Sequence, residues 1–510
     1  MSSIRFASLF LVWIVACGDD SSSDAGGGSD ASATDVPAAV DALGMDVPGV
    51  DAAGIDVGPG SDAGPGMDVG PGFDAGPTDA GPQDAGPLPD FPADWPRSRG
   101  WEWVRNNDPF VSALSVRMGS PPAAAANRYF DEFNANAVHL WQTGLPDAIA
   151  GWKAARPDSR WLTWVDSRGN SSTNNMLLGG SPRPAGLIGY QVGDEPRDRA
   201  HFTDIMGALA RVRAADPDPL RVFNFTFLAP EIDAFLREAC AAGDTDVFSY
   251  DRYSFGNGQF TTMMKFRNAA LACGIPAWRY MRAYRGPEDP VSAASDLRWD
   301  AFSGLLAGYT GHSWFIYNVL GGTAEGIPTS LFATTDDWNA ATTSQFAAVA
   351  QINRELIVYG RAQTRLRSTG VAWAASREIS GSHPPDDFPA WRAGAGGDSI
   401  LQSVNADGGF FQDVLLGFYV DRFGDHYMMV MNPNHEEGSF PTDSETPARV
   451  TLGFNFAGAA GVSTTQVQVL RPTGVVEVLP LGGGELNLTI AAGDLVFLKY
   501  DTGRGFEGYR

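Results

Sequence analysis

Two adjacent acids follow a short apolar stretch in the middle of the sequence. The stretch reads LIGYQV and continues as GDEP, which places Asp194 and Glu195 directly after it. A short apolar run bounded by glycines is typical of a buried strand, so both carboxyls would lie at the strand's carboxyl end. Paired carboxyls can donate and accept the proton that cleavage of a glycosidic bond requires. The alternative is that Asp194 only caps a helix that starts near Pro196.

The elements that would position these acids alternate along residues 96–366. Apolar strand-like runs are separated by helix-like segments such as RDRAHFTDIMGALARVRAADP, in which apolar residues recur every three or four residues. The predicted strands are 110–116, 137–142, 160–166, 187–193, 220–227, 246–250, 275–282 and 312–317. Eight strands that alternate with helices predict an α/β fold, a (β/α)8 TIM barrel. An open doubly wound sheet is the alternative, but no Gly-x-Gly-x-x-Gly turn opens any of the helices.

Residues 367–510 have a different pattern. Short segments such as HYMMVMN, ELNLTI and LVFLKY recur with turn residues between them. They predict a C-terminal antiparallel β-sandwich, for which a supporting role and a sugar-binding role are both open.

The N-terminus resembles the signal of a bacterial lipoprotein. Arg5 precedes an apolar stretch that ends in IVAC, which is similar to a lipobox. The resemblance implies a signal peptide over residues 1–17 and lipidation of Cys17. With Gly18 after the cysteine, it also implies an anchor in the outer membrane or at the cell surface. A plain secretory signal or a membrane helix is the alternative, but the run is too short to span a bilayer.

Residues 18–95 are rich in Asp, Gly, Pro and Ala. Sixteen Asp, and no Lys, Arg or Glu, lie between Asp19 and Asp94. No apolar face forms on such a repeat, so we predict a disordered linker. Calcium binding is the alternative, and it is disfavoured because the spacing of the Asp residues does not suit the ligands of a single ion. Of the net charge of −24, the residues after 95 carry only −9, which argues against nucleic acid as a partner.

If the barrel forms, the carboxyl ends of its strands meet on one side of the molecule. The residues expected there combine aromatic rings with acids and amides, which suits a carbohydrate ligand. They are Trp141, Trp164, Asp166, Asp194, Glu195, Asn224, Asp251, Tyr253, Arg282, Trp314 and Tyr317. The sequence has no His-x-x-x-His or Cys-x-x-Cys pair for a metal and no Gly-x-Ser-x-Gly elbow for a serine esterase, and we expect no cofactor.

Four segments together resemble the barrel of the bacterial β-galactosidase-like glycoside hydrolases. They are GYQVGDEP, DVFSYDRYSF, GIPAWRYMRAY and GLLAGYTGHSWFIYN, and the resemblance covers roughly residues 100 to 360. The resemblance implies hydrolysis of a poly- or oligosaccharide, with Glu195 matching the acid/base glutamate of strand four. Asp194 stands where the family has an Asn. Where the family has a nucleophilic Glu on strand seven, this chain has Met281 or its neighbours.

The missing strand-seven glutamate leaves the second catalytic carboxyl open. Asp251, Asp166, Asp194 and Glu288 are the candidates, and Asp251 is favoured because strand six opens onto the same side of the barrel. Arg282 would help to bind an anionic sugar. The competing hypothesis is a carbohydrate-binding barrel that is displayed on the cell surface and has no catalytic activity.

Cys240 and Cys273 end the helices that precede strands six and seven. Such helices are neighbours on a barrel wall, and an exported chain meets oxidising conditions. We therefore expect a disulfide, with two buried thiols as the alternative.

Overall fold

The computed structural model describes residues 91–509, apart from several internal gaps. These gaps are 116–119, 141–144, 168–184, 256–257, 285–291, 319–329, 335–337, 375–387, 408–412 and 437–446. The predicted signal peptide, Cys17 and residues 18–90 of the predicted linker lie outside the described residues, as do Trp141 and Glu288. In the described part of the chain no helix is both long and apolar enough to cross a membrane.

The folded body begins at Phe91, before the linker end expected at residue 95. The rings of Phe91 and Trp95 stack with their centroids 5.3 Å apart, and Trp95 is buried. The guanidinium of Arg105 lies over both rings. Aromatic burial and cation–π contact hold residues 91–95 on the protein.

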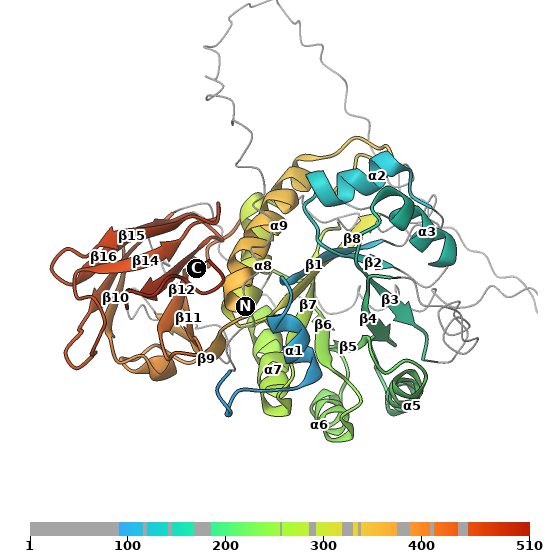
Figure 1. The fold of residues 1–510 in the computed structure, drawn as a ribbon, viewed down its shortest axis with the longest axis horizontal. Coiled ribbons are helices and arrows are strands. Elements are labelled where there is room, and N and C mark those ends of the chain that lie inside the picture. The colour runs from blue at the N-terminus through green and yellow to red at the C-terminus, as the bar shows by residue number, and fades with distance from the viewer. Residues whose placement is uncertain are drawn as a thin grey trace, which may run out of the picture. The chain divides into compact units, whose positions relative to one another are not determined.

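Eight parallel strands, all within the described residues, form a closed barrel, which confirms the (β/α)8 prediction and rejects the open sheet (Figure 1). The strands are β1 (Phe110–Ser115), β2 (Val138–Leu140), β3 (Trp161–Val165), β4 (Leu187–Val192), β5 (Leu220–Thr226), β6 (Val247–Asp251), β7 (Ala277–Arg282) and β8 (Gly311–Asn318). The helices are α1 (Arg99–Arg105), α2 (Ala123–Asn127), α3 (Leu145–Ala155), α5 (Arg199–Ala215), α6 (Ile232–Ala242), α7 (Gly258–Cys273), α8 (Ala294–Leu306) and α9 (Ser344–Gln363), with a π-turn at Arg128–Glu132.

Apolar side chains fill the amino-terminal end of the barrel interior. The rings of Phe110 and Trp278 stack there with centroids 4.5 Å apart, in a cluster that also contains Val222. Gly311 is required at this level because a Cβ would lie 2.3 Å from the Trp278 ring. Side chains two residues further along a strand point to the same face, so polar residues on β5 and β7 gather above this layer.

A buried ion pair outside the barrel fixes the orientation of β7. Arg279 and Asp300 of α8 are both buried and paired, and Asp300 Oδ2 accepts the backbone N–H of Arg282 at 3.0 Å. Met281 is likewise fully buried in the core between strands and helices. Since side chains alternate along a strand, Tyr280 points into the barrel.

The described strands after the barrel form two antiparallel sheets, as predicted for the C-terminal part. They are β9 (Arg367–Ala374), β10 (Leu401–Asp407), β11 (Val414–Val420), β12 (His426–Met431), β13 (Ala448–Phe454), β14 (Gln466–Leu470), β15 (Val476–Pro480), β16 (Glu485–Ile490) and β17 (Leu495–Tyr500), with a 3-10 turn at Ala395–Gly397. One sheet has the order β10-β13-β16 and the other β15-β14-β17-β12-β11-β9. The hydroxyl of Tyr419 on β11 lies 2.8 and 2.7 Å from the carbonyl oxygens of Leu305 and Leu306, which ties this part to α8.

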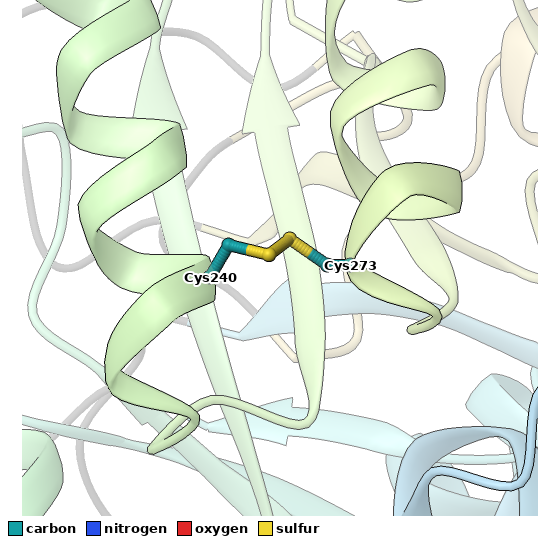
Figure 2. The surroundings of a disulfide bond; sticks show 2 residues. All are labelled: Cys240 and Cys273. Carbon is teal, nitrogen blue, oxygen red and sulfur yellow. A yellow bond between two sulfur atoms is a disulfide. The ribbon is translucent and has the colours of Figure 1, made fainter.

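Cys240 near the end of α6 and Cys273 at the end of α7 form a disulfide, the pairing expected from the sequence (Figure 2). Their Cα atoms are 5.5 Å apart. The bond joins the helices that precede β6 and β7, and these strands carry Asp251 and Tyr280 to the carboxyl end of the barrel.

Replacing both cysteines by serine is expected to lower the free energy of unfolding by about 3–4 kcal/mol, because the bond closes a loop with a sequence separation of 33 residues. Urea unfolding of the wild type and the double variant measures this difference. Alkylation of the unfolded, unreduced wild type should label neither Cys240 nor Cys273, and labelling of both would contradict the pairing.

Candidate active site

Asp194 and Glu195 follow β4 and precede the next helix without capping it. Helix α5 begins at Arg199, and its N-cap is Asp198, whose carboxylate accepts the N–H of His201 at 2.8 Å. The alternative in which Asp194 only caps a helix is therefore wrong.

The backbone that carries Glu195 is strained. Its φ is +41°, in the left-handed region, which costs a residue with a Cβ roughly 1–2 kcal/mol. The N–H of Glu195 donates to the carbonyl oxygen of Asn224 on β5 at 3.2 Å. The preceding Gly193 has a φ of +68°, and a Cβ there would lie 2.4 Å from Ile205 of α5. The packing of α5 and the hydrogen bond to β5 together hold this turn in place.

The carboxyl of Glu195 makes two contacts of opposite electrostatic effect. Its Oε2 lies 3.2 Å from Nη2 of Arg197, and the carboxyl also lies close to that of Asp251, the last residue of β6. Burial, and then the charge of Glu195, raise the pKa of Asp251 well above its ordinary value.

Asp194 is held by two amides. Its Oδ1 accepts hydrogen bonds from Nε2 of Gln191 at 3.0 Å and from Nδ2 of Asn224 at 2.8 Å. Burial, and then the charge of Glu195, raise the pKa of Asp194 to about 7, against the opposing effect of these bonds and of Arg197. Near neutral pH this carboxyl is therefore divided between its acid and its ionised form.

A chain of hydrogen bonds leads from Asp194 across the barrel. The hydroxyl of Tyr280 donates to Oε1 of Gln191 at 2.6 Å and lies 2.9 Å from Nδ1 of His139 on β2. Burial lowers the pKa of His139 to about 3, so its ring is neutral at pH 7. Burial, and then the charges of Asp194 and Asp251, raise the pKa of Tyr280 well above its ordinary value, so the phenol stays protonated.

The sequence analysis missed four residues of this cluster. They are His139, Gln191, Arg197 and Tyr280. The alternation of side chains along β2, β4 and β7 is the signal that could have indicated three of them. Arg197 lies in the turn after β4, where no periodicity applies.

Tyr253 also lies beside the acids. Burial, and then the charges of Asp251 and Glu195, raise the pKa of Tyr253 well above its ordinary value. Its ring packs edge-on against Tyr284 and stacks on Phe315, in both cases with centroids 5.4 Å apart. The packed ring gives the acid pair an apolar neighbour, which favours its protonated form.

Trp164 lies near the end of β3, and Asp166 directly follows the strand; both are half-buried. Trp164 is the register partner of Gln191 on β4. The structure therefore places Trp164 next to the strand that carries Asp194.

Arg282, which was predicted to help bind an anionic sugar, contacts aromatic rings of the protein. The guanidinium of Arg282 lies over the rings of Phe255 and Tyr284, and its Nε donates to the carbonyl oxygen of Tyr284 at 3.2 Å. Arg282 is buried by these contacts.

Two of the predicted sugar-stacking residues point away from the barrel interior. Trp314 is fully buried, and its Nε1 donates to Oδ1 of Asn353 on α9 at 2.7 Å. Tyr317 is buried against the rings of Phe133 and Phe332. Both pack beneath the outer helices, so their prediction as substrate contacts was wrong.

The structure brings Asp251, the acid that the sequence favours as the second catalytic carboxyl, close to Glu195. In retaining glycosidases the two catalytic carboxyls lie about 5–5.5 Å apart, and in inverting enzymes roughly 6.5–9.5 Å apart.

No second carboxyl comes from the strand where the β-galactosidase-like hydrolases have their nucleophile. Along the described β7, Tyr280 points inward, and Met281 is buried outside the barrel. Among the described residues, no three His, Cys, Asp or Glu side chains gather in a way that could hold a metal ion. Proton transfer is thus the chemistry that these side chains can perform.

The chain is a (β/α)8-barrel protein with an acid cluster at the carboxyl end of the barrel. Comparison with protein-family models gives no match, and comparison with curated proteins gives none.

The solved structures that it is similar to include glycoside hydrolases. An α-L-arabinofuranosidase from Thermotoga maritima is 10% identical with a TM-score of 0.41, and the match covers 77% of this chain and 97% of that one. A GH30 endoxylanase from Clostridium papyrosolvens C71 is 10% identical with a TM-score of 0.40, over 78% and 97%. An endo-β-1,4-mannanase from Thermotoga petrophila is 8% identical with a TM-score of 0.36, over 64% and 96%. These similarities are too low to transfer a function, which must come from the site.

Asp194→Asn is expected to gain stability relative to the wild type as the pH rises from 4 to 8. Because its pKa is raised to about 7, native Asp194 keeps a proton that the unfolded chain releases, which costs the wild type stability between about pH 4 and pH 7. Thermal unfolding at both pH values measures the difference, with Asp204→Asn on the exposed face of α5 as the control. An Asp194→Asn offset in Tm that is the same at both pH values would show that this carboxyl does not titrate in that range.

Proposed function

We propose that this protein is a glycoside hydrolase that acts on a poly- or oligosaccharide, with Glu195 as the general acid. The observation that carries the proposal is the gathering of Asp194, Glu195 and Asp251 at the carboxyl ends of β4 and β6. Neighbouring carboxyls in a partly desolvated site can donate and accept the protons that glycosidic cleavage requires. The position at the carboxyl end of barrel strands supports the same conclusion, since βα-loop ends carry the active sites of this fold.

Glu195, rather than Asp251, is assigned the proton donation. Glu195 is half-buried, whereas Asp251 is buried. Glu195 is therefore the more accessible of the two acids to a ligand outside the barrel. The resemblance to the strand-four glutamate of the β-galactosidase-like hydrolases agrees with this assignment.

Glu195→Gln is expected to lower kcat/KM by about 10²–10⁴-fold on whichever glycoside the wild type cleaves, because the amide cannot donate an acidic proton. The measurement is hydrolysis of a panel of aryl glycosides and polysaccharides by the full chain. Glu102→Gln on the exposed face of α1 is the matched control and should retain full activity. Equal activity of Glu195→Gln and the control would remove Glu195 from catalysis.

A carbohydrate-binding barrel without catalysis is the second candidate. It is favoured by one observation: among the described residues, β7 supplies Tyr280 and no carboxyl to the barrel interior. Under this alternative, the wild type and Glu195→Gln would bind the same oligosaccharide, and neither would cleave it.

The proposal includes export and a lipid anchor. It rests on the lipobox-like IVAC, in which Cys17 would be lipidated and Gly18 would direct the protein to the outer membrane or cell surface. The linker that we expect over residues 18–90 would then hold the barrel away from the bilayer, where it could meet an external polysaccharide.

Labelling of a bacterial host with radioactive palmitate tests the anchor. The wild type and the nearby control Ser21→Ala should incorporate the label, and Cys17→Ala should not, because it lacks the thiol that would be acylated. Label retained by Cys17→Ala would overturn the lipoprotein assignment.

A further inference from the structure

The site has a proton donor but lacks a nucleophile on the strand where one was expected. Above Trp278 the inward side chain of β7 is Tyr280, whose hydroxyl already donates to Gln191 at 2.6 Å. Burial and the nearby acids keep its pKa well above the ordinary value, so the phenol is a poor nucleophile. The substrate itself is another source of the attacking atom.

The atoms of the site that remain without partners are hydrogen-bond acceptors. Among the described residues, Oδ1 of Asp251 and Oδ1 of Asn224 are buried and accept no hydrogen bond, although these residues are only 7% and 2% exposed. Both amide bonds to Asp194 go to its Oδ1, which leaves its Oδ2 to accept from a ligand. Buried acceptors are costly unless a donor reaches them, so the ligand that fits this site brings N–H or O–H groups.

We infer that the substrate is a β-linked N-acetylhexosaminide whose own 2-acetamido group is the nucleophile, with Asp194 accepting the amide N–H. This inference rests on the proposed function and deepens it. Substrate-assisted hydrolysis of this kind is an exception to the two-carboxylate mechanisms of glycosidases. It needs one acid to protonate the leaving oxygen and one carboxylate beside the amide, and adjacent Glu195 and Asp194 supply both.

In the first step the acetamido oxygen forms a bond to the anomeric carbon while the bond from that carbon to the leaving oxygen breaks. The proton of Glu195 goes to the leaving oxygen. The cyclic oxazolinium that forms is positively charged at its N–H, which donates to the carboxylate of Asp194. The charge of Asp194 thus stabilises a cation that does not exist in the ground state.

In the second step the Glu195 carboxylate takes a proton from water, and the water oxygen bonds to the anomeric carbon. The bond to the acetamido oxygen breaks, and its electron pair restores the neutral amide. The net change is the hydrolysis of one glycosidic bond, and two inversions retain the configuration. The geometry requires the acetamido group to be trans to the leaving oxygen, as in β-linked gluco- and galacto-sugars.

Other substituents at the same ring carbon fit the site less well. A 2-hydroxyl could donate to Asp194, but its attack would close a strained three-membered ring. A 2-ammonium group would be attracted by the acids, but it has no lone pair with which to attack. The acetamido group alone combines a donor for Asp194 with an oxygen that closes a five-membered ring.

The test compares aryl β-N-acetylglucosaminide and β-N-acetylgalactosaminide with the matching aryl β-glucoside and β-galactoside, using the full chain. We expect at least one acetamido substrate to be cleaved with retention, more than about 100-fold faster than its 2-hydroxyl counterpart; fluorination of the acetyl group should slow it. Cleavage of the 2-hydroxyl glycosides, or of 2-amino glycosides, at a comparable rate would overturn the inference and leave the proposed function standing. Cleavage of neither class, together with cleavage of another glycoside of the wider panel, would overturn the inference alone. Cleavage of no glycoside at all would overturn both.

A thiazoline analogue of the oxazolinium provides a readout that does not depend on turnover. It should raise the Tm of the wild type and of the α5 control Asp204→Asn, and it should fail to raise that of Asp194→Asn. Asp194→Asn should also lose about 10²–10³-fold in kcat, as expected when a group that stabilises transition-state charge is removed. An Asp194→Asn variant that binds the thiazoline and cleaves substrate as the wild type does would contradict the role of Asp194 as the acceptor of the amide N–H.

Discussion

The gathering of the carboxyls of Asp194, Glu195 and Asp251 at one end of the barrel is the constraint on which the site depends. Burial and the charge of Glu195 raise the pKa values of Asp194 and Asp251, because charges gathered at this depth repel one another. The acids come from the ends of β4 and β6, and β5 lies between these strands in the barrel. Asn224 of β5 binds the backbone of Glu195 and the side chain of Asp194. Barrel closure thus enforces a contact that the two acids would not form alone.

Arg197 offsets part of this repulsion, since its guanidinium lies 3.2 Å from Glu195 and its charge lowers the pKa of Asp194. The side chain of Arg197 is 35% exposed, however, and an ion pair open to solvent contributes only about 0–1 kcal/mol. Burial therefore outweighs Arg197 at Asp194, whose pKa is raised to about 7.

The sequence predicted the strands of the barrel well because each is a short apolar run, and it predicted Asp194, Glu195 and Asp251 because they end such runs. Hydrophobicity alone does not show which side chains point inward, because the strands of a parallel barrel are buried on both faces and their hydrophobicity does not alternate. Trp314 was therefore predicted as a ligand contact although it faces α9, and Tyr280 was overlooked although it points inward.

The turn after β4 explains how neighbours in sequence can serve two different atoms of one ligand. The left-handed conformation of Glu195 directs its carboxyl to Asp251, while the carboxyl of Asp194 is directed to Gln191 and Asn224. A leaving oxygen and a 2-substituent stand on adjacent carbons of a sugar ring, one ring bond apart. Because the two carboxyls diverge from one rigid turn, they can serve groups on adjacent ring carbons without a side chain from β7. The strain at Glu195 is the cost of this divergence, and a helical or extended residue at this position would not direct the two acids in these two directions.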